Sequence, residues 1–484
     1  MGMAVARSIK GYCGIAADSR NVRTGFLFAA LPGTKTNGAR FIADAVDRGA
    51  VAVLGAPEAA AEARSHGVAF VSDNNPRQRL SLMAAEFFAD QPLHIAAVTG
   101  TNGKTSIVSF LRQIWTQLGH KAASLGTLGV DAPSGHVSLR HTTPDPVELH
   151  MQLARLSQEG VKHLALEASS HGLDQFRLDG ARIAAAGFTN ITRDHLDYHS
   201  DFEHYFSAKM RLFGELLGEG GLAVVNADAP HADEVVSIAA RRAAQVLTVG
   251  KKGDAIKLLA RTPYESGQKI HLRHENRDYT IDLPLVGEFQ ISNAFIAAGL
   301  AIGLGAPAER VFASLETLKG TPGRMELVAY AASGAPIYVD YAHTPDAMQT
   351  VLDALRPHVK NQLIIVFGCG GERDSGKRPL MGAVACNSAD VSILTDDNPR
   401  GEDPAAIRRE AMEGCPSAIE VADRRAAIQV GIEMLSPGDA LILGGKGHEE
   451  GQIVGTEILP FSERKEAIRI ALALGGRAAQ DMRL

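Results

Sequence analysis

The stretch Leu93–Thr105, LHIAAVTGTNGKT, decides the fold class of this chain. Its first half, Leu93–Val98, is a short apolar run that predicts a buried parallel strand. The glycine-rich segment Gly100–Thr105 follows, and a helical pattern then continues to Leu118. A strand, a glycine-rich turn and a helix start predict a phosphate-binding loop, because backbone N–H groups and a helix N-terminus favour an anion.

The residues of this loop suit a nucleoside triphosphate and its metal ion. Glycines let backbone N–H groups turn toward phosphate oxygens, the Lys104 ammonium neutralises these oxygens, and the Thr105 hydroxyl is a ligand for Mg²⁺. Val98 stands where the common phosphate-loop pattern has its first glycine. We therefore predict ATP and Mg²⁺ as cofactors. The residues predicted to bind ATP here are Gly100, Thr101, Asn102, Gly103, Lys104 and Thr105.

Strand and helix patterns alternate along the chain, which predicts an α/β fold with parallel sheets covered by helices on both faces. The predicted strands are 51–54, 68–71, 93–98, 163–166, 184–188, 223–225, 337–339, 363–367, 391–394 and 440–443. The predicted helices are 41–48, a stretch that follows Thr105 and ends at Leu118, 292–302, 345–355 and 404–412. Residues 257–285 alternate as antiparallel strands do, and we expect Gly475–Leu484 to be frayed.

The length of 484 residues predicts about three domains. The predicted bounds are 1–91, 92–324 and 325–484, with a linker at Phe87–Pro92. The central domain carries the phosphate loop on a parallel sheet, and the third repeats the α/β pattern as a Rossmann-like domain.

Composition excludes several classes of function. The formal net charge is −6 and no polybasic arm is present, so we expect no nucleic-acid partner. The chain has no apolar run of membrane-spanning length, and its first residues lack the apolar core of a signal peptide. Its four cysteines form no CxxC pair, so we expect reduced thiols rather than disulfides or a zinc site. We therefore expect a cytoplasmic, monomeric protein that acts on small molecules.

Polar side chains follow two strands of the predicted central sheet. Glu167 comes directly after the strand 163–166, and the segment Asn190–His199, with His195, follows the strand 184–188. Because the carboxyl ends of parallel strands meet at one edge of a sheet, we expect both near the phosphate loop. Glu167 can then hold a divalent ion.

Three strands of the last domain also end in polar segments: Gly368–Asp374, Thr395–Arg400 and Gly445–Glu449. Arg400 offers a guanidinium fork for a carboxylate, and Glu449 accepts from an ammonium. These groups at one sheet edge predict a site for a ligand with a carboxylate and an ammonium group.

The variant loop TGTNGKT resembles that of the Mur ligases, the ATP-dependent enzymes that build the peptide of bacterial cell-wall precursors, and of their relatives the folylpolyglutamate synthases. The resemblance extends over nearly the whole chain, from Asp18 to Glu449. It implies an ATP-dependent ligase that acts through an acyl phosphate.

The resemblance also implies roles for residues that spacing alone leaves open. It implies that Lys209 is carbamylated (N6-carboxylysine) and supports Mg²⁺ together with Thr105, Glu167 and His195. The implied catalytic residues are Lys104, His195, Lys209 and Arg324. Asn293, Arg324 and Asp340 are expected to lie at the nucleotide, with Arg324 at the γ-phosphate and Asp340 at the ribose.

The segments expected to bind the UDP-linked substrate also resemble the family pattern. The N-terminal segments Asp18–Arg20, Gly25–Ala29 and Gly33–Gly38 resemble its uridine-diphosphate-binding domain. The residues implied to bind UDP-N-acetylmuramoyl-L-alanyl-D-glutamate are Ser19, Thr34, Lys35, Thr36, His141, Thr142, Thr143, Ser169, Gln175 and Arg177.

The segment Asp397–Arg400, DNPR, resembles that of family members that add meso-2,6-diaminopimelate, whose distal centre carries both a carboxylate and an ammonium. The residues implied to bind this amino acid are Arg373, Asp397, Asn398, Pro399, Arg400, Gly445 and Glu449. A lysine-adding ligase and a folylpolyglutamate synthase are the alternatives. Arg400 disfavours the first, and the uridine-domain pattern disfavours the second. A nucleotide-dependent switch without ligation is a third reading.

Overall fold

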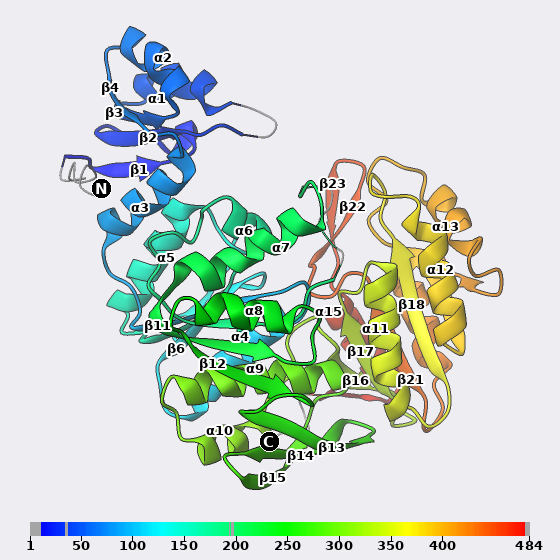
Figure 1. The fold of residues 1–484 in the computed structure, drawn as a ribbon. Helices are drawn as coiled ribbons and strands as arrows, with labels where there is room; N and C mark the ends of the chain where they lie inside the picture. Colours follow the sequence, from blue (N-terminus) through cyan, green and yellow to red (C-terminus); the bar gives the residue numbers. More distant parts are fainter. Residues whose placement is uncertain (1–10, 34–36, 193, 195–197, 480–484) are drawn as a thin grey trace. The chain divides into compact units, whose positions relative to one another are not determined.

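The computed structural model describes residues 11–33, 37–192, 194 and 198–479. These residues form three main sheets and a two-stranded hairpin, with helices between the strands (Figure 1). The chain divides into two compact units, Met1–Lys257 with Phe295–Val311 and Leu258–Ala294 with Phe312–Leu484. The predicted α/β class with parallel sheets is confirmed, whereas the bounds 1–91, 92–324 and 325–484 remain predictions.

The first sheet has four parallel strands in the order β1-β2-β3-β4. Its elements are β1 (Gly14–Ala16), β2 (Phe26–Ala30), α1 (Ile42–Asp47), β3 (Ala50–Gly55), α2 (Ala60–Ser65), β4 (Ala69–Ser72) and α3 (Pro76–Phe88), with short 3₁₀ helices at Ser19–Asn21, Gly38–Phe41 and Pro57–Ala59. Successive side chains of β2 point to opposite faces of the sheet. Leu27 therefore packs in one buried cluster with Leu80 of α3, and Phe28 in another with Ile42 of α1.

The second sheet has the strand order β15-β14-β13-β12-β11-β10-β5-β9-β6-β7-β8. Its strands are β5 (His94–Thr99), β6 (Ala122–Gly126), β7 (Gly129–Ala132), β8 (Gly135–Val137), β9 (His163–Glu167), β10 (Ile183–Phe188), β11 (Leu217–Asn226), β12 (Gln245–Gly250), β13 (Ile256–Tyr264), β14 (Gly267–His274) and β15 (Arg277–Leu283). β5 lies parallel between β9 and β10, with Val98 opposite Glu167 and Thr99 opposite Phe188. The phosphate loop therefore starts beside the ends of both neighbouring strands, as the sequence predicted.

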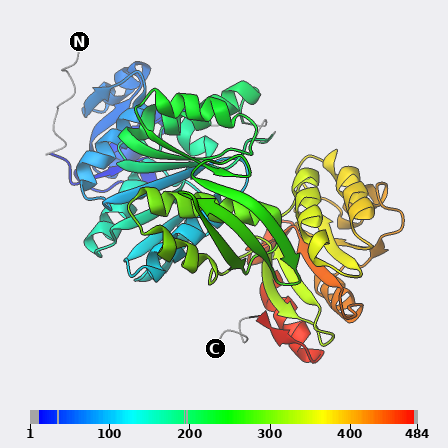
Figure 2. The same cartoon turned by 60° about the horizontal axis from the view of Figure 1, so that its bottom comes forward.

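Helices cover both faces of this sheet (Figure 2). They are α4 (Lys104–Gln117), α5 (Pro146–Gln158), α6 (Ser170–Asp174), α7 (Phe202–Arg211), α8 (Ala232–Ala240), α9 (Glu288–Gly303) and α10 (Ala308–Leu315), with a π-helical turn at Leu212–Leu216. Among the helices of the described residues, none is both long and apolar enough to cross a membrane.

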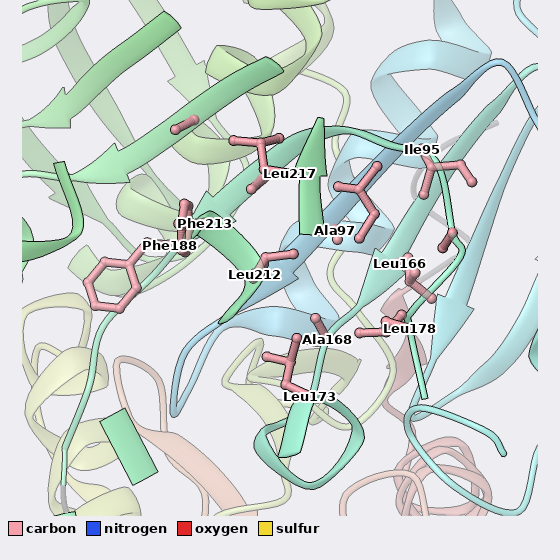
Figure 3. Close-up of a cluster of buried hydrophobic side chains, with 14 of the residues drawn as sticks. Ile95, Ala97, Leu166, Ala168, Leu173, Leu178, Phe188, Leu212, Phe213 and Leu217 are labelled. Atoms are coloured by element: carbon pink, nitrogen blue, oxygen red, sulfur yellow. The ribbon is translucent and has the colours of Figure 1, made fainter. Parts of the chain in front are cut away.

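A large buried core fixes the strands that carry the loop (Figure 3). Ile95 and Ala97 of β5 pack with Leu166 of β9, and with Leu173 and Leu212 from the helical segments on that face. All five side chains are fully buried. Burying a leucine or isoleucine side chain contributes roughly 1.5–3 kcal/mol, so packing, rather than the polar loop, holds the strand ends in place.

The third sheet has the strand order β20-β19-β18-β21-β17-β16-β24. Its elements are β16 (Glu326–Tyr330), β17 (Pro336–Asp340), α11 (Pro345–Leu355), β18 (Leu363–Cys369), α12 (Lys377–Ser388), β19 (Val391–Asp396), α13 (Pro404–Met412), β20 (Ile419–Glu420), α14 (Arg424–Glu433), β21 (Ala440–Gly444), α15 (Glu463–Ala473) and β24 (Arg477–Ala478), with a 3₁₀ turn at Arg356–His358 and a separate hairpin of β22 (Gly451–Val454) and β23 (Glu457–Pro460). β18 lies parallel between β19 and β21. The three predicted polar segments therefore leave one edge of the sheet.

Two expectations are wrong. Residues up to Ala478 are not frayed, because Arg477 and Ala478 pair with Tyr330 and Ala329 of the edge strand β16, and the Arg477 guanidinium lies 4.4 Å from the centre of the Tyr330 ring. The cysteines are not all reduced.

Cys386 of α12 and Cys415 after α13 form a disulfide. The close contact of these two helices brings the thiols together across 29 residues of sequence. A Cβ at Gly382 of α12 would lie 2.0 Å from the Ala411 carbonyl oxygen of α13, so glycine there permits the contact. The absence of a CxxC motif therefore does not exclude a disulfide between cysteines that two packed helices bring together.

Candidate functional site

The phosphate loop has the conformation that its glycines permit. Gly100 has φ +149° and Gly103, the N-cap of α4, has φ +88°. A Cβ at Gly100 would lie 1.9 Å from Oγ1 of Thr189, so no other residue fits there. The Lys104 ammonium donates to the carbonyl oxygens of Gly100 (2.7 Å) and Thr101 (2.8 Å). The loop, its lysine and the start of α4 are thus assembled as the sequence predicted.

The segment after β10 holds this loop. The backbone N–H of Thr101 donates to the carbonyl oxygen of Asn190, and that of Asn102 donates to the Asn190 side chain, both at 3.0 Å. The Thr189 hydroxyl donates to the Asn102 carbonyl oxygen at 2.6 Å. His195, further along this segment, lies outside the described residues, so its predicted metal and catalytic roles stay predictions.

Glu167 lies beside the loop, as predicted from the strand ends. Its buried carboxylate accepts from the Thr105 hydroxyl at 3.2 Å and from the N–H of Thr127 at 2.8 Å. A hydroxyl and one carboxylate are the protein ligands that Mg²⁺ takes when phosphate oxygens and water complete its shell. Thr105 and Glu167 therefore fit a Mg²⁺ ion whose other ligands are phosphate oxygens and water. Among the described residues, no group of three or more His, Cys, Asp and Glu side chains is placed to hold a metal ion.

Lys209 of α7 reaches the same loop. Its side chain is 1% exposed, and its Nζ donates to the Gly100 carbonyl oxygen at 2.8 Å. The Nζ also lies 4.5 Å from the centre of the Tyr205 ring, whose hydroxyl is 3.0 Å from that of Thr101. Burial, with the nearby Lys104 charge, holds the pKa of Lys209 well below its usual value. A lysine that spacing alone would place on a solvated helix is therefore a buried amine at the phosphate loop.

Four of the residues implied to bind the UDP-linked substrate lie together next to Glu167. The Thr143 hydroxyl donates to the Glu167 carbonyl oxygen at 2.9 Å and lies 3.0 Å from the Ser169 hydroxyl. Arg177 donates to the Thr143 carbonyl oxygen at 2.6 Å and to Oε1 of Gln175 at 2.7 Å. This segment places hydroxyl, amide and guanidinium groups beside the phosphate loop.

The other residues predicted for this substrate are less closely joined. The Thr142 hydroxyl lies 3.0 Å from that of Thr127, and His141 is exposed. Ser19, the first residue of the 3₁₀ helix that follows β1, is buried at 6% exposure. Thr34, Lys35 and Thr36 lie outside the described residues.

In the second unit, Gln290 joins Asn293 to Arg324, and Asp340 binds the residue that follows Arg324. The Asn293 amide donates to Gln290 at 2.9 Å, and Gln290 donates to the Arg324 carbonyl oxygen at 3.5 Å. The Asp340 carboxylate accepts from the N–H of Met325 at 2.7 Å. Burial raises the pKa of Asp340, although the Arg324 charge and the backbone donors oppose this shift.

The residues predicted to bind a carboxylate and an ammonium lie at the ends of β19 and β21. Asn398 donates from Nδ2 to Oε2 of Glu449 at 3.0 Å. The Arg400 Nη1 donates to the carbonyl oxygens of Gly371 at 2.8 Å and Asn398 at 3.3 Å. Because these bonds occupy Nη1, the Nε and Nη2 edge of Arg400 remains for a ligand carboxylate, as far as the described residues show.

Arg400 takes its place through an unusual backbone conformation. Its φ is +52°, in the left-handed region. Its N–H donates to the Ile453 carbonyl oxygen at 3.1 Å, and its carbonyl oxygen accepts from Gly455 at 2.7 Å. The β22–β23 hairpin thus compensates the strain at Arg400.

The remaining predicted residues of this site surround it. Pro399 and Gly445 are buried, and Arg373 is exposed on the loop after β18. The carboxylate of Asp397 lies 3.1 Å from Nζ of Lys446, with only 10% of its side chain exposed.

Sequence reasoning missed three residues of these sites. Thr127 binds Glu167 through both its N–H and its hydroxyl. Tyr341 lies under the Arg324 guanidinium, 4.7 Å from ring centre to Cζ. Lys446 is fully buried between Asp397 and Glu449. The sequence carries a signal for Lys446, because it stands inside the polar segment Gly445–Glu449 that was already singled out.

A glycine-rich loop beside a carboxylate in one unit, and a guanidinium and a carboxylate at one sheet edge in the other, are typical of a class of protein: the ATP-dependent enzymes that join an acid to an amine. Models of three family domains match the chain, the Mur ligase family catalytic domain at residues 12–88, the Mur ligase middle domain at 98–301 and the Mur ligase glutamate ligase domain at 323–447. The chain belongs to the Mur ligase family, and this confirms the resemblance.

Curated relatives and solved structures agree with the family assignment. The UDP-N-acetylmuramoyl-L-alanyl-D-glutamate–2,6-diaminopimelate ligase of Bradyrhizobium diazoefficiens is 53% identical over 466 residues, 95% of this chain and 94% of the relative. The protein of the same name from Caulobacter vibrioides is 50% identical over 94% of both chains. A solved ligase of that name superposes with a TM-score of 0.71 at 35% identity, over 96% of this chain and 95% of that one. A MurF ligase from Thermotoga maritima in complex with ADP, 18% identical with a TM-score of 0.60 over 95% and 96%, shares the fold.

Proposed function

We propose that this protein joins meso-2,6-diaminopimelate to UDP-N-acetylmuramoyl-L-alanyl-D-glutamate, the UDP-dipeptide substrate, with conversion of ATP to ADP and phosphate. The relatives at about half identity, which carry this activity in their names, support the proposal. Within the chain, the observation that carries it is the pair of Arg400 and Glu449 at the edge of the third sheet, each bound to Asn398. A guanidinium and a carboxylate held apart match the distal carboxylate and ammonium of a diamino dicarboxylic acid.

ATP is proposed to bind the loop Gly100–Thr105, with Asn293, Arg324 and Asp340 as further contacts. The glycine conformations and the N-terminus of the long helix α4 favour phosphate there. Mg²⁺ would be held by Thr105 and Glu167, and its chemistry is to neutralise charge on the phosphate oxygens.

Lys209 supports this site as a carbamate. A neutral amine attacks the carbon of CO₂, an N–C bond forms, and one proton leaves. The lowered pKa of the buried Lys209 favours the neutral amine that this reaction needs. The product is a carboxylate beside Gly100, where His195 would be a further metal ligand.

The reaction divides into two steps. The γ-carboxylate of the D-glutamyl residue attacks the γ-phosphorus of ATP, the bond to the bridging oxygen breaks, and an acyl phosphate and ADP result. The amine of diaminopimelate then attacks the acyl carbon, and phosphate leaves with the amide formed. Lys104 and Arg324 neutralise charge, while Thr143, Ser169 and Arg177 orient the acceptor.

We further propose that the protein acts in the cytoplasm, where both ATP and nucleotide-linked precursors are available, and that it is a monomer. Ser19 and the segment with Thr34, Lys35 and Thr36 are proposed to hold the uridine diphosphate. Light scattering of the purified protein measures its mass in solution, and a dimer mass would contradict the second proposal.

One assay tests the proposed activity. The purified protein is mixed with ATP, the UDP-dipeptide and one amino acid from a panel that includes meso-diaminopimelate, L-lysine and L-glutamate, and products are identified by mass. We expect ADP release that requires both substrates, and a product equal to the UDP-dipeptide plus diaminopimelate minus water. A lysine product would indicate the lysine-adding alternative. In a parallel reaction with a folate in place of the UDP-dipeptide, glutamate addition would indicate the folylpolyglutamate synthase. ADP release without either substrate would contradict ligation.

A further inference from the structure

Lys446, after β21, is the one lysine of the third sheet's polar edge that no proposed role above uses. Its side chain is 0% exposed. Its Nζ donates to Oδ1 of Asn398 at 2.8 Å and to the Gly451 carbonyl oxygen at 3.0 Å, and it lies 3.1 Å from Oδ1 of Asp397 and 3.5 Å from Oε2 of Glu449. A buried ammonium is stable only when paired in this way. Lys446 therefore links three parts of the chain: the segment Thr395–Arg400 after β19, the segment Gly445–Glu449 in which it stands, and the β22–β23 hairpin.

The ammonium fixes which end of the Asn398 amide faces Glu449. Asn398 Oδ1 accepts from Lys446 and from the N–H of Ile453 at 2.9 Å, while Nδ2 donates to Glu449 at 3.0 Å. An ammonium carries only donors, so a flipped amide would place donor against donor. The Asn398 amide is therefore held in the orientation that holds the Glu449 carboxylate.

The ammonium also sets the charge of the site. Asp397 and Glu449 are two carboxylates within 3.5 Å of one cation. Asp397 is the more buried, with 10% of its side chain exposed against 34% for Glu449. The pairing of Lys446 with Asp397 leaves Glu449, the more accessible carboxylate, with a net negative charge for a ligand ammonium.

We infer that Lys446 is a positioning residue for the ammonium end of the incoming diamino acid, because it holds Asn398 and Glu449 in place and neutralises Asp397. The inference rests on the proposed function, since it assumes that Glu449 binds the distal ammonium. Lys446 itself contacts no reacting atom.

The test replaces Lys446 by methionine, which keeps the length of the side chain and removes its charge and donors. We expect the KM for diaminopimelate to rise about tenfold or more, since hydrogen bonds to charged groups stabilise by roughly 1.5–3 kcal/mol, and the KM for ATP to stay within about twofold. Lys465→Met is the matched control, because Lys465 is 69% exposed and pairs with the exposed Glu450. We expect it to behave as the wild type.

A second pair of variants separates positioning from stability. Lys446→Met leaves Asp397 buried without its cation, so it also lowers the melting temperature. Adding Asp397→Asn removes that unpaired charge and restores the melting temperature. The KM for diaminopimelate of the double variant is then compared with that of Asp397→Asn alone, and we expect it to remain about tenfold higher. The double variant also carries the test if the single variant does not fold.

Two outcomes overturn the inference: an unchanged KM for diaminopimelate in a folded Lys446→Met protein, or equal KM values for the double variant and Asp397→Asn alone. Either result makes Lys446 a structural residue only. The proposed function fails separately, if the wild-type protein does not use diaminopimelate.

Discussion

Arg400→Asn tests whether the guanidinium selects diaminopimelate. Asparagine tolerates a positive φ better than most side chains, so the backbone at φ +52° is preserved. The change removes the Nε and Nη2 edge and with it two charge-assisted hydrogen bonds to the distal carboxylate, each worth roughly 1.5–3 kcal/mol. Because Arg400 is only half-buried, water replaces part of this stabilisation. We expect a loss of about 3 kcal/mol, or about a hundredfold in kcat/KM for diaminopimelate.

The assay compares initial rates of ADP release with meso-diaminopimelate and with L-lysine, which lacks the distal carboxylate. The lysine rate, however small, should not fall in the variant, and the KM for ATP should stay unchanged. Arg409→Asn on α13 is the control, since that side chain is 69% exposed. An equal fall for both amino acids would refute the reasoning, because the arginine would then support the site as a whole rather than one carboxylate.

Three further predictions concern other parts of the molecule. Lys209→Ala should lower turnover at least about a hundredfold and cost turnover far more than stability, because its buried amine reaches the phosphate loop at the Gly100 carbonyl oxygen; turnover equal to the wild type would contradict its place at the metal. Glu463→Gln should cost about 3 kcal/mol in urea denaturation, because it leaves the fully buried Arg424 without its counter-charge, whereas Glu466→Gln, which breaks pairs with the exposed arginines Arg425 and Arg469, should cost less than about 1 kcal/mol; equal losses would contradict this. Burial lowers the pKa of His150 to about 4, below the ordinary 6.5, so the unfolded chain takes up the proton first and the free energy of unfolding falls by about 3 kcal/mol as pH drops from 6.5 to 4. The variant His150→Gln should lack this part of the fall, and parallel stability curves would show that His150 is not its source.

The parts of the fold that apolar runs specify could be predicted from the sequence. β5, β9 and β10 are buried on both faces, so their sequences are continuous apolar runs, and parallel pairing then brings the residues after them to one edge. The contact between Thr105 and Glu167 follows from that rule alone. The same rule brings Arg400 and Glu449 to one edge of the third sheet.

Other features depend on tertiary contacts that leave no periodic signal. Lys446 stands in a Gly-Lys-Gly segment that is typical of an exposed turn, and its burial depends on Asn398, 48 residues away. The disulfide depends on a helix contact that glycine permits. Lys209 lies on an amphipathic helix whose pattern does not distinguish a buried lysine from a solvated one, so only the resemblance to the family indicated its place.

The hairpin bond to Arg400 also bears on how amino-acid specificity can be exchanged between ligases of this kind. A chimaera that receives only Asp397–Arg400 from a donor would set a left-handed arginine against a foreign strand, whose backbone acceptor and donor would have to lie where those of Ile453 and Gly455 lie here. The smallest unit that can be grafted is therefore two segments, 397–400 together with 445–455. Selectivity in this chain is a property of two distant stretches that have to be inherited as a pair.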